Sequence, residues 1–268
     1  MNFRALIRNA LVSYKLTFDC QNAFKRMIWV YALKNKFKRT YSSVSEIMFK
    51  YPLPIALITV RVRENNGSDI FIFGEVFDQK NYYLSHKNEV KYIVDLGANA
   101  GFTALYYSRL FPLATIACVE PYSANVSILT DNLNINNVAF KVFEAAISVE
   151  DHPIEMELSD NDYGHKVKEI MYGKKIGGKS VTVAGLSMNK LIETLCWPAI
   201  NILKIDIEGY EGVLFRKNTE WLQLVETIIM EIHENVSIEQ IRVATDKYHF
   251  DYALKRNGNW ILSKFEIN

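Results

Sequence analysis

Apolar and polar residues alternate with different periods along the chain, and these periods predict the order of its elements. Short apolar runs, typical of buried strands, occur at 91–97, 114–121, 138–148, 200–209 and 225–233. Helical spacing separates several of them, at 101–111, 123–135 and 209–217. Strands that alternate with helices are typical of βαβ units. We therefore predict an α/β fold with a mostly parallel sheet that is buried on both faces.

Two further stretches predict antiparallel strand pairs. Residues 55–77 alternate between apolar and polar positions and carry Asn66-Gly67 in their middle, which predicts a β-hairpin. Residues 248–267 read as a strand, a turn at Asn257-Gly258 and a second strand. The second pair is expected to close the sheet at its edge.

The N-terminal segment predicts an amphipathic basic helix. Its apolar face carries Phe3, Leu6, Ile7, Ala10, Leu11, Tyr14 and Phe18. Residues 1–50 hold ten basic and two acidic side chains. Two interpretations stay open: a helix packed on the body of the protein, which we favour, or a docking element that makes peripheral membrane contact through residues 1–40.

Composition sets the domain organisation and the class of protein. With 268 residues, 49% of them hydrophobic, the chain can bury a full core. We divide it into a basic helical segment at 1–50, a hairpin and connector at 51–89, and the main domain at 90–268, with a loop at 159–180. No apolar run approaches the roughly 20 residues of a membrane span, and no cleavage signal follows the basic start, so a cytoplasmic protein is predicted. Three widely spaced cysteines without a CxxC pair argue against a disulfide framework and a thiolate zinc site.

The stretch VDLGANAGFT, residues 94–103, predicts a ligand-binding turn between a strand and a helix. Gly97 permits a tight turn, and Gly101 lets the new helix come close to the strand and to a ligand. The G-x-x-x-G spacing behind Asp95 fits neither a phosphate loop nor a dinucleotide fingerprint, and a purely structural turn is the alternative. Glu120 ends the next strand, where a carboxylate can accept hydrogen bonds from a ribose diol or simply face solvent.

Together, VDLGANAGFTALYYS, VEPYSANVSILTDNLNINN, AAIS and ILKIDIEGYEGVLF followed by IIMEIHE resemble the FkbM-type family of class I S-adenosylmethionine-dependent methyltransferases. The resemblance spans about residues 90–235. It implies a Rossmann-like, seven-stranded sheet with a reversed last strand. It also implies S-adenosyl-L-methionine as cofactor and methyl transfer, typically to a hydroxyl of a sugar or natural product.

Site residues follow from the resemblance position by position. Glu120 would hold the ribose, and Glu144 and Ala145 would border the adenine. The methionine part of the cofactor would be framed by Asp95, Gly97, Ala98, Asn99 and Gly101.

The candidate catalytic residues stand at the ends of two expected strands. Asp206 and Glu208 end one of them, and Glu231 and His233 project to the same face at the end of the next. His233, with an ordinary pKa near ~6.5, would take the acceptor proton while a carboxylate orients it. Helix capping for the acids and a rim position for the histidine are the alternatives. The spacings are not a dedicated metal signature, so no metal is predicted, although such a cluster can bind Mg²⁺.

These observations predict an O-methyltransferase for a small-molecule or glycan acceptor. The alternative from another class is a catalytically inactive cofactor-binding or scaffolding protein with the same fold. An NAD-type oxidoreductase is disfavoured by the G-x-x-x-G spacing. A nucleic-acid substrate is not expected despite the basic segment, because DIEG stands where an N/D-P-P-Y/F motif for base methylation would be.

Overall fold

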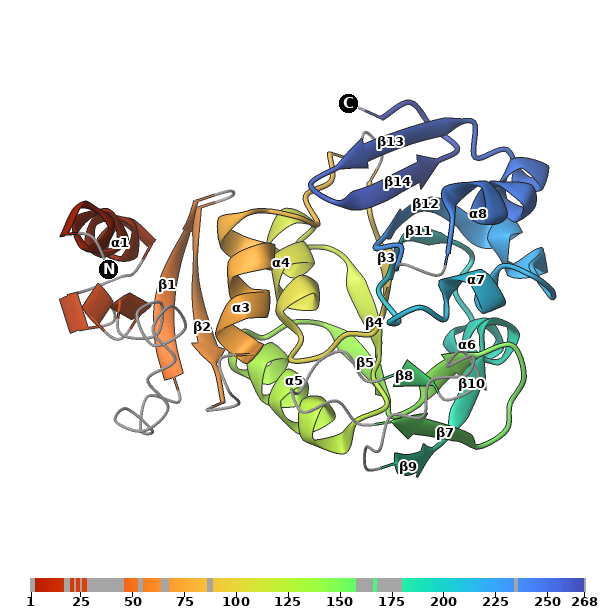
Figure 1. The fold of residues 1–268 in the computed structure, drawn as a ribbon, viewed down its shortest axis with the longest axis horizontal. Coiled ribbons are helices and arrows are strands. Elements are labelled where there is room, and N and C mark those ends of the chain that lie inside the picture. The colour runs from red at the N-terminus through yellow and green to blue at the C-terminus, as the bar shows by residue number, and fades with distance from the viewer. Residues whose placement is uncertain are drawn as a thin grey trace.

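A computed structural model describes residues 3–16, 20–21, 23–24, 26–27, 46–52, 55–63, 68–85, 89–157, 166–167, 180–233 and 236–267. Its centre is a seven-stranded sheet in the order β13-β14-β12-β11-β3-β4-β5 (Figure 1). The strands are β3 (Tyr92–Leu96), β4 (Thr115–Val119), β5 (Phe140–Phe143), β11 (Ile200–Ile205), β12 (Val225–Met230), β13 (Tyr252–Arg256) and β14 (Asn259–Ser263).

Only β14 runs in the direction opposite to the other six strands. It pairs antiparallel with both β12 and β13, whereas β3, β4, β5, β11 and β12 pair in parallel. The β13–β14 turn lies at Asn257-Gly258, where both residues have positive φ. The predicted sheet, with its reversed last strand and terminal pair, is therefore confirmed.

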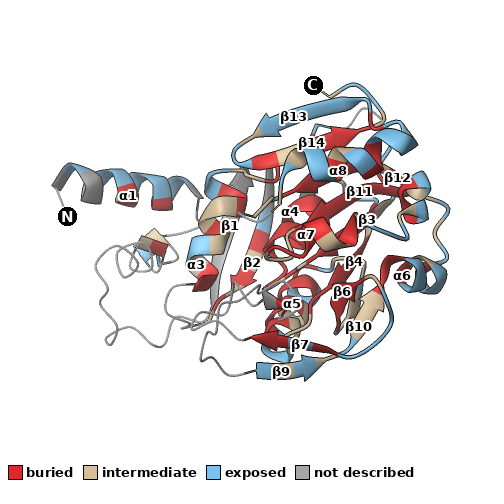
Figure 2. Ribbon diagram, turned by 45° about the vertical axis from the view of Figure 1, so that its right-hand side comes forward, coloured by how far each residue is buried: buried red, intermediate tan, exposed pale blue. Residues whose placement is uncertain are grey.

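Two hydrophobic cores lie on the two faces of this sheet. Alternate strand residues face opposite sides, so Ile93 and Ile116 join one core while Val94 and Ala117 join the other. The first core includes α4 (Phe102–Leu110) and α5 (Ser123–Ile135), and the second includes α6 (Met188–Leu195), α7 (Glu211–Leu214) and α8 (Ile238–Thr245). Short 3-10 turns, η3 (Glu220–Leu224) and η4 (Asp246–Tyr248), precede β12 and β13. The central strands are buried on both faces, as predicted (Figure 2).

The N-terminal hairpin differs from the prediction. It is formed by β1 (Glu46–Pro52) and β2 (Ile55–Arg61), and β1 crosses the boundary predicted at residue 50. The expected second strand is instead helical, as α3 (Ser68–Phe73) and the π-helical turn η1 (Gly74–Asp78). Apolar residues in this stretch also fit a helical period, and Phe73, Val76 and Phe77 are buried in the first core. The Asn66-Gly67 turn lies outside the described residues.

The hairpin is attached to the body through two asparagine side chains, Asn132 of α5 and Asn136 directly after its last residue. Asn132 accepts from the Arg61 N–H at 2.7 Å, and Asn136 accepts from the Thr59 N–H at 3.0 Å. Both amides also donate back to carbonyls of the same strand, at 3.2 and 2.6 Å. Because α5 satisfies the edge of β2, the two-stranded hairpin gains a support that it would lack alone.

The region after β5 also departs from the expected single strand. Residues 138–148 divide into β5 and β6 (Ala146–Ser148), which pairs with β10 (Gly185–Ser187). A small sheet of β7 (Ile154–Glu157), β8 (Lys166–Val167) and β9 (Ser180–Val183) lies beside it. The loop predicted at 159–180 thus contains β8 and the first residue of β9, and its other residues lie outside the described part.

Helix α1 (Phe3–Leu16) turns much of its apolar face outward. Ile7, Leu11 and Tyr14 are 44, 57 and 63% exposed, while Asn9 and Ser13 are buried. Figure 2 shows exposed residues along much of α1. The favoured expectation, an apolar face packed on the body, is not met at these three residues. Peripheral membrane contact stays a prediction. Among the helices that the structure describes, none combines the length and apolar character needed to cross a membrane.

Candidate active site

A cavity of about 490 Å³ opens at the carboxyl ends of the central strands. Backbone hydrogen bonds align these ends: Asp206 N–H donates to Leu96 at 3.2 Å, and Glu231 N–H donates to Ile205 at 3.0 Å. The strand order reverses between β3 and β11, and in open α/β sheets such a reversal leaves a crevice for a ligand. The residues that follow these strands therefore surround one space.

The glycine turn after β3 forms one wall of the cavity. Gly97 has φ +74°, and a Cβ there would lie 1.9 Å from the backbone oxygen of Asp206, so only glycine fits. Gly101 has φ +79°, and a Cβ there would come within 3.0 Å of Leu129 Cγ on α5. Gly101 thus permits close packing of two helices, whereas the sequence analysis expected approach to the strand and the ligand. Ala98 and Asn99, between them, line the cavity.

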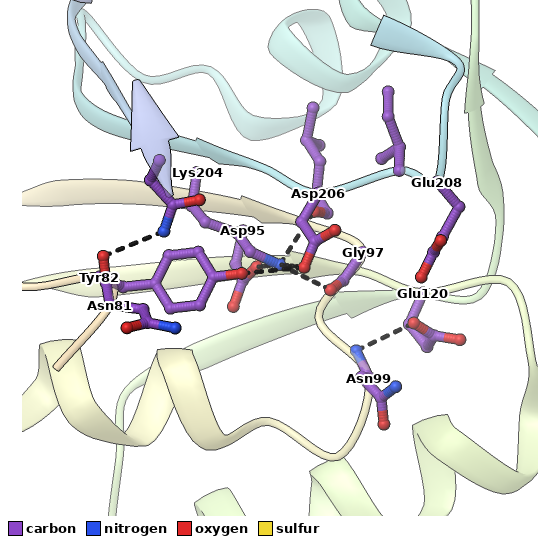
Figure 3. A network of polar contacts seen from close by, with 12 residues as sticks. Asn81, Tyr82, Asp95, Gly97, Asn99, Glu120, Lys204, Asp206 and Glu208 are labelled. Carbon is purple, nitrogen blue, oxygen red and sulfur yellow. Dashed lines mark hydrogen bonds and ion pairs between the residues drawn. The ribbon is translucent and has the colours of Figure 1, made fainter. Parts of the chain in front are cut away.

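Glu120 lies behind this turn and is held by it. Its carboxylate accepts a hydrogen bond from the Asn99 N–H at 2.9 Å (Figure 3). It also accepts from the Tyr122 N–H at 3.1 Å and from the Asn125 amide at 3.0 Å. Burial raises the pKa of Glu120, although these hydrogen bonds oppose the rise. A carboxylate offers about four lone-pair sites, so Glu120 can also accept from a ligand in the cavity.

Lys204, which the sequence analysis did not select, occupies the floor of the cavity. Its Nζ lies 3.1 Å from Asp95 Oδ1 and 3.7 Å from Asp206 Oδ2, and donates to the Gly97 carbonyl at 2.7 Å (Figure 3). Asp95 is fully buried and does not line the cavity, so it acts on the site through Lys204. The sequence did carry a signal for this residue, because Lys204 lies within the apolar strand 200–205 and lysine is almost never fully buried unless it is paired with an acid.

His233 is surrounded by carboxylates from the neighbouring strand end. Its Nδ1 lies 3.0 Å from Glu211 Oε1, and its Nε2 lies 3.3 Å from Glu208 Oε2 and 4.0 Å from Asp206 Oδ1. Burial lowers the pKa of His233, but hydrogen bonds to Glu208 and Glu211 outweigh it and raise the pKa to about 11. The imidazole is therefore charged at neutral pH, in contrast to the partly neutral base expected from an ordinary pKa.

Glu211 connects His233 to the backbone that follows β11. Its side chain is fully buried, and Oε1 also accepts from the backbone N–H groups of Gly209 and Ile207 at 3.2 and 3.3 Å. The sequence shows Glu211 as an ordinary acid in the first turn of a short helix. Only its contact with His233, 22 residues further on, distinguishes it.

The wall opposite the strand ends comes from the helical segment at 68–78. Glu75 lines the cavity there, and burial, followed by the charges of Glu231 and Asp206, raises its pKa to about 7. Tyr82 donates its hydroxyl to Asp206 Oδ2 at 2.9 Å. Because the sequence analysis placed residues 68–77 in a strand, it missed Glu75.

The cavity thus brings together most of the residues selected from the sequence. Asp95, Gly101 and Glu144 do not line it, and Glu144 is exposed, so its contact with adenine stays a prediction. The selected residues that do line it are Gly97, Ala98, Asn99, Glu120, Ala145, Asp206, Glu208, Glu231 and His233.

The sheet order, the single reversed strand and the crevice define a class I methyltransferase fold. Residues 95–256 match the Methyltransferase FkbM domain family, and this match covers more than half of the chain. The chain belongs to that family and is a methyltransferase.

Two relatives in sequence and one solved structure can be compared with this chain. The protein "Methyltransferase 1" of Beauveria bassiana (strain ARSEF 2860) is 26% identical over 183 residues, covering 60% of this chain and 72% of the relative. The "Hexuronic acid methyltransferase AglP" of Haloferax volcanii is 34% identical over 62 residues, covering 23% of this chain and 26% of the relative. The crystal structure of Methyltransferase FkbM from Methylobacillus flagellatus KT superposes with a TM-score of 0.47 and 11% identity, covering 96% of this chain and 58% of that one.

Proposed function

We propose that the protein is an S-adenosylmethionine-dependent O-methyltransferase whose acceptor is a hydroxyl of a sugar, glycan or natural product. The observation that carries this proposal is the glycine turn, with the buried Glu120 carboxylate behind it, at the point where the strand order reverses. When bound, S-adenosylmethionine supplies the methyl group as a sulfonium.

The residues present fit this cofactor. Glu120 is a buried acceptor that suits a ribose diol, and it would repel a phosphate there. Gly97, Ala98 and Asn99 would hold the amino-acid end, and Ala145 and Val119 add an apolar surface suited to the base. Asp206, Glu208 and Glu231 add negative charge to the same cavity, which favours a cationic ligand.

The substrate that receives the methyl group would bind beside the carboxylates of Asp206, Glu208 and Glu231. Carboxylates are acceptors only, so a ligand with several hydroxyl donors can satisfy them. The phosphates of a nucleic acid would instead be repelled, which supports the prediction that nucleic acid is not the substrate. One relative, over a short match, is named a hexuronic acid methyltransferase.

Methylation of a hydroxyl requires a group that accepts its proton. In the absence of other ligands, His233 already carries a proton at neutral pH, because its pKa is raised to about 11. Glu75 lines the same cavity, and its pKa of about 7 leaves it partly ionised near neutrality, as a general base requires. We assign Glu75 as the group that takes the proton. His233, Asp206, Glu208 and Glu231 would position the substrate hydroxyl.

Calorimetric titration of the full chain with S-adenosylhomocysteine tests the proposal. We expect saturable one-site binding that Glu120→Gln weakens about tenfold or more, because hydrogen bonds to a charged group are worth about 1.5–3 kcal/mol. Glu150→Gln is the matched control, since Glu150 is exposed and pairs with Lys217. Absence of binding to folded wild-type protein would refute the cofactor site.

A labelled-methyl screen of hydroxyl acceptors tests the second half of the proposal. Binding of S-adenosylhomocysteine without turnover of any acceptor would favour the inactive cofactor-binding protein. Binding of NADH instead of S-adenosylhomocysteine would favour an oxidoreductase.

A further inference from the structure

One side-chain cluster in the cavity has the composition of a metal site. Asp206 and Glu208 follow β11, and His233 follows β12. Each offers one ligand atom, and the three atoms lie within 4.8 Å of one another. Glu208 is positioned by a backbone in the left-handed region, with φ +55°, which is uncommon for glutamate and occurs at functional sites.

A buried carboxylate supports the cluster from behind. Glu211 contacts His233 Nδ1 at 3.0 Å and so directs Nε2 toward Asp206 and Glu208. Histidines that bind metals usually donate their other N–H to such a carboxylate. The second oxygen of Glu211, Oε2, is buried without a hydrogen-bond partner among the described residues. A buried carboxylate oxygen without a hydrogen-bond partner lowers the stability of the folded protein unless a positive charge lies nearby.

Negative charge exceeds positive charge in this part of the cavity. Asp206, Glu208, Glu211, Glu231 and Glu75 face two basic side chains, Lys204 and His233. Lys204 is already paired with the buried Asp95. Asp206 and Glu208 both lie within 4.0 Å of His233, and Glu75 and Glu231 line the same cavity, so several acids share a small space. A small cation of charge two would offset this excess.

We propose that Asp206, Glu208 and His233 bind a divalent cation, with Glu211 as the positioning residue for His233. Two carboxylate oxygens and one imidazole nitrogen suit a first-row ion such as Mn²⁺, which accepts both ligand types. The sequence analysis predicted no metal, because no motif spacing marks one. The site arises where two strand ends meet.

The role of the cation rests on the proposed function, whereas the site itself does not. A cation here would contact an acceptor hydroxyl and lower its pKa. The proton released from that hydroxyl would pass to the Glu75 carboxylate, which lines the same cavity. A cation bound at Nε2, the nitrogen that faces Glu208, would leave the ring hydrogen on Nδ1, where it can be donated to Glu211.

Titration of the metal-free full chain with Mn²⁺, followed by the electron paramagnetic resonance signal of unbound Mn²⁺, tests the site. We expect one saturable site per chain. Glu208→Gln should weaken binding by about tenfold or more, and Glu211→Gln by a similar factor, as for removal of an outer-shell partner. Glu231→Gln is the matched control: it removes the same charge from the same cavity but lies outside the ligand set.

A spectroscopic readout identifies the histidine directly. Electron spin echo modulation from an imidazole nitrogen should accompany bound Mn²⁺ in the wild-type protein and disappear in His233→Gln. Equal weakening in Glu208→Gln and Glu231→Gln would overturn the proposal, because the acidic field alone would then explain binding. Absence of saturable binding or of the nitrogen modulation would also overturn it.

Calorimetry with S-adenosylhomocysteine on the same preparations separates the two proposals. Cofactor binding without Mn²⁺ binding would remove the cation site and leave the proposed methyl transfer. Mn²⁺ binding without cofactor binding would support the site and remove the proposed function.

Discussion

Replacement of Lys204 by methionine is expected to destabilise the protein strongly. The side chains of Lys204 and Asp95 are 3% and 0% exposed, and their charged atoms lie 3.1 Å apart. Lys204→Met keeps the length and the apolar stem but leaves Asp95 buried without its cation. Removal of one partner from a buried pair costs about 3–5 kcal/mol, so we expect a loss of this size in the free energy of unfolding.

The loss should depend on pH in a defined direction. Burial raises the pKa of Asp95, and Lys204 opposes that rise. Without Lys204 the folded-state pKa of Asp95 rises further, so the folded variant binds a proton more tightly than the unfolded chain does. Its stability is then highest below the unfolded pKa of about 3.9 and falls as pH rises toward the folded value. The variant should therefore lie closer to the wild type at pH 5 than at pH 8.

Urea unfolding at both pH values measures these differences. Lys190→Met is the matched control, because Lys190 and Glu193 form an ion pair at 2.9 Å with exposed side chains, and the change should have far less effect. In the double variant with Asp95→Asn, the loss should be smaller than the sum of the single losses. Additive losses, or a loss no larger than that of Lys190→Met, would refute the reasoning.

Three further predictions concern the glycine turn, the proposed base and the N-terminal helix. Gly97→Ala should lower the free energy of unfolding by about 2 kcal/mol more than Gly258→Ala, because both glycines have positive φ but only Gly97 would place a Cβ against backbone, and urea unfolding measures the difference. Without added divalent cation, turnover should rise with pH through about 7, where Glu75 ionises, and a pH profile of Glu75→Gln that keeps this limb would remove Glu75 as the proton acceptor. The protein should sediment with vesicles that contain phosphatidylserine but not with pure phosphatidylcholine vesicles, and Leu11→Asp should abolish this whereas Leu113→Asp, at an exposed leucine outside α1, should not. Sedimentation that is unchanged by Leu11→Asp would exclude α1 as the contact.

The sequence predicted the elements whose signals are local. Runs of apolar residues placed β3, β4, β11 and β12 within a few residues, because strands buried on both faces must be apolar throughout. The prediction failed at 68–77, where an apolar pattern fits both periods and burial against α4 selects the helix. The partner of β2 was also missed: β1 directly precedes β2, with Pro52 paired to Ile55, whereas the sequence analysis took Asn66-Gly67 as the turn and looked for the partner after β2.

For the active site, the sequence by itself determined which side chains stand at the carboxyl ends of the strands: the glycine turn, Glu120, Asp206 and His233. Tertiary structure alone decided their charge states and partners. Asp95 meets Lys204 more than 100 residues away, and Glu211 meets His233 across two strand ends. Electrostatic energy depends on distance and burial, which spacing along the chain does not contain, so the charged His233 and the candidate cation cluster emerge only in the folded protein.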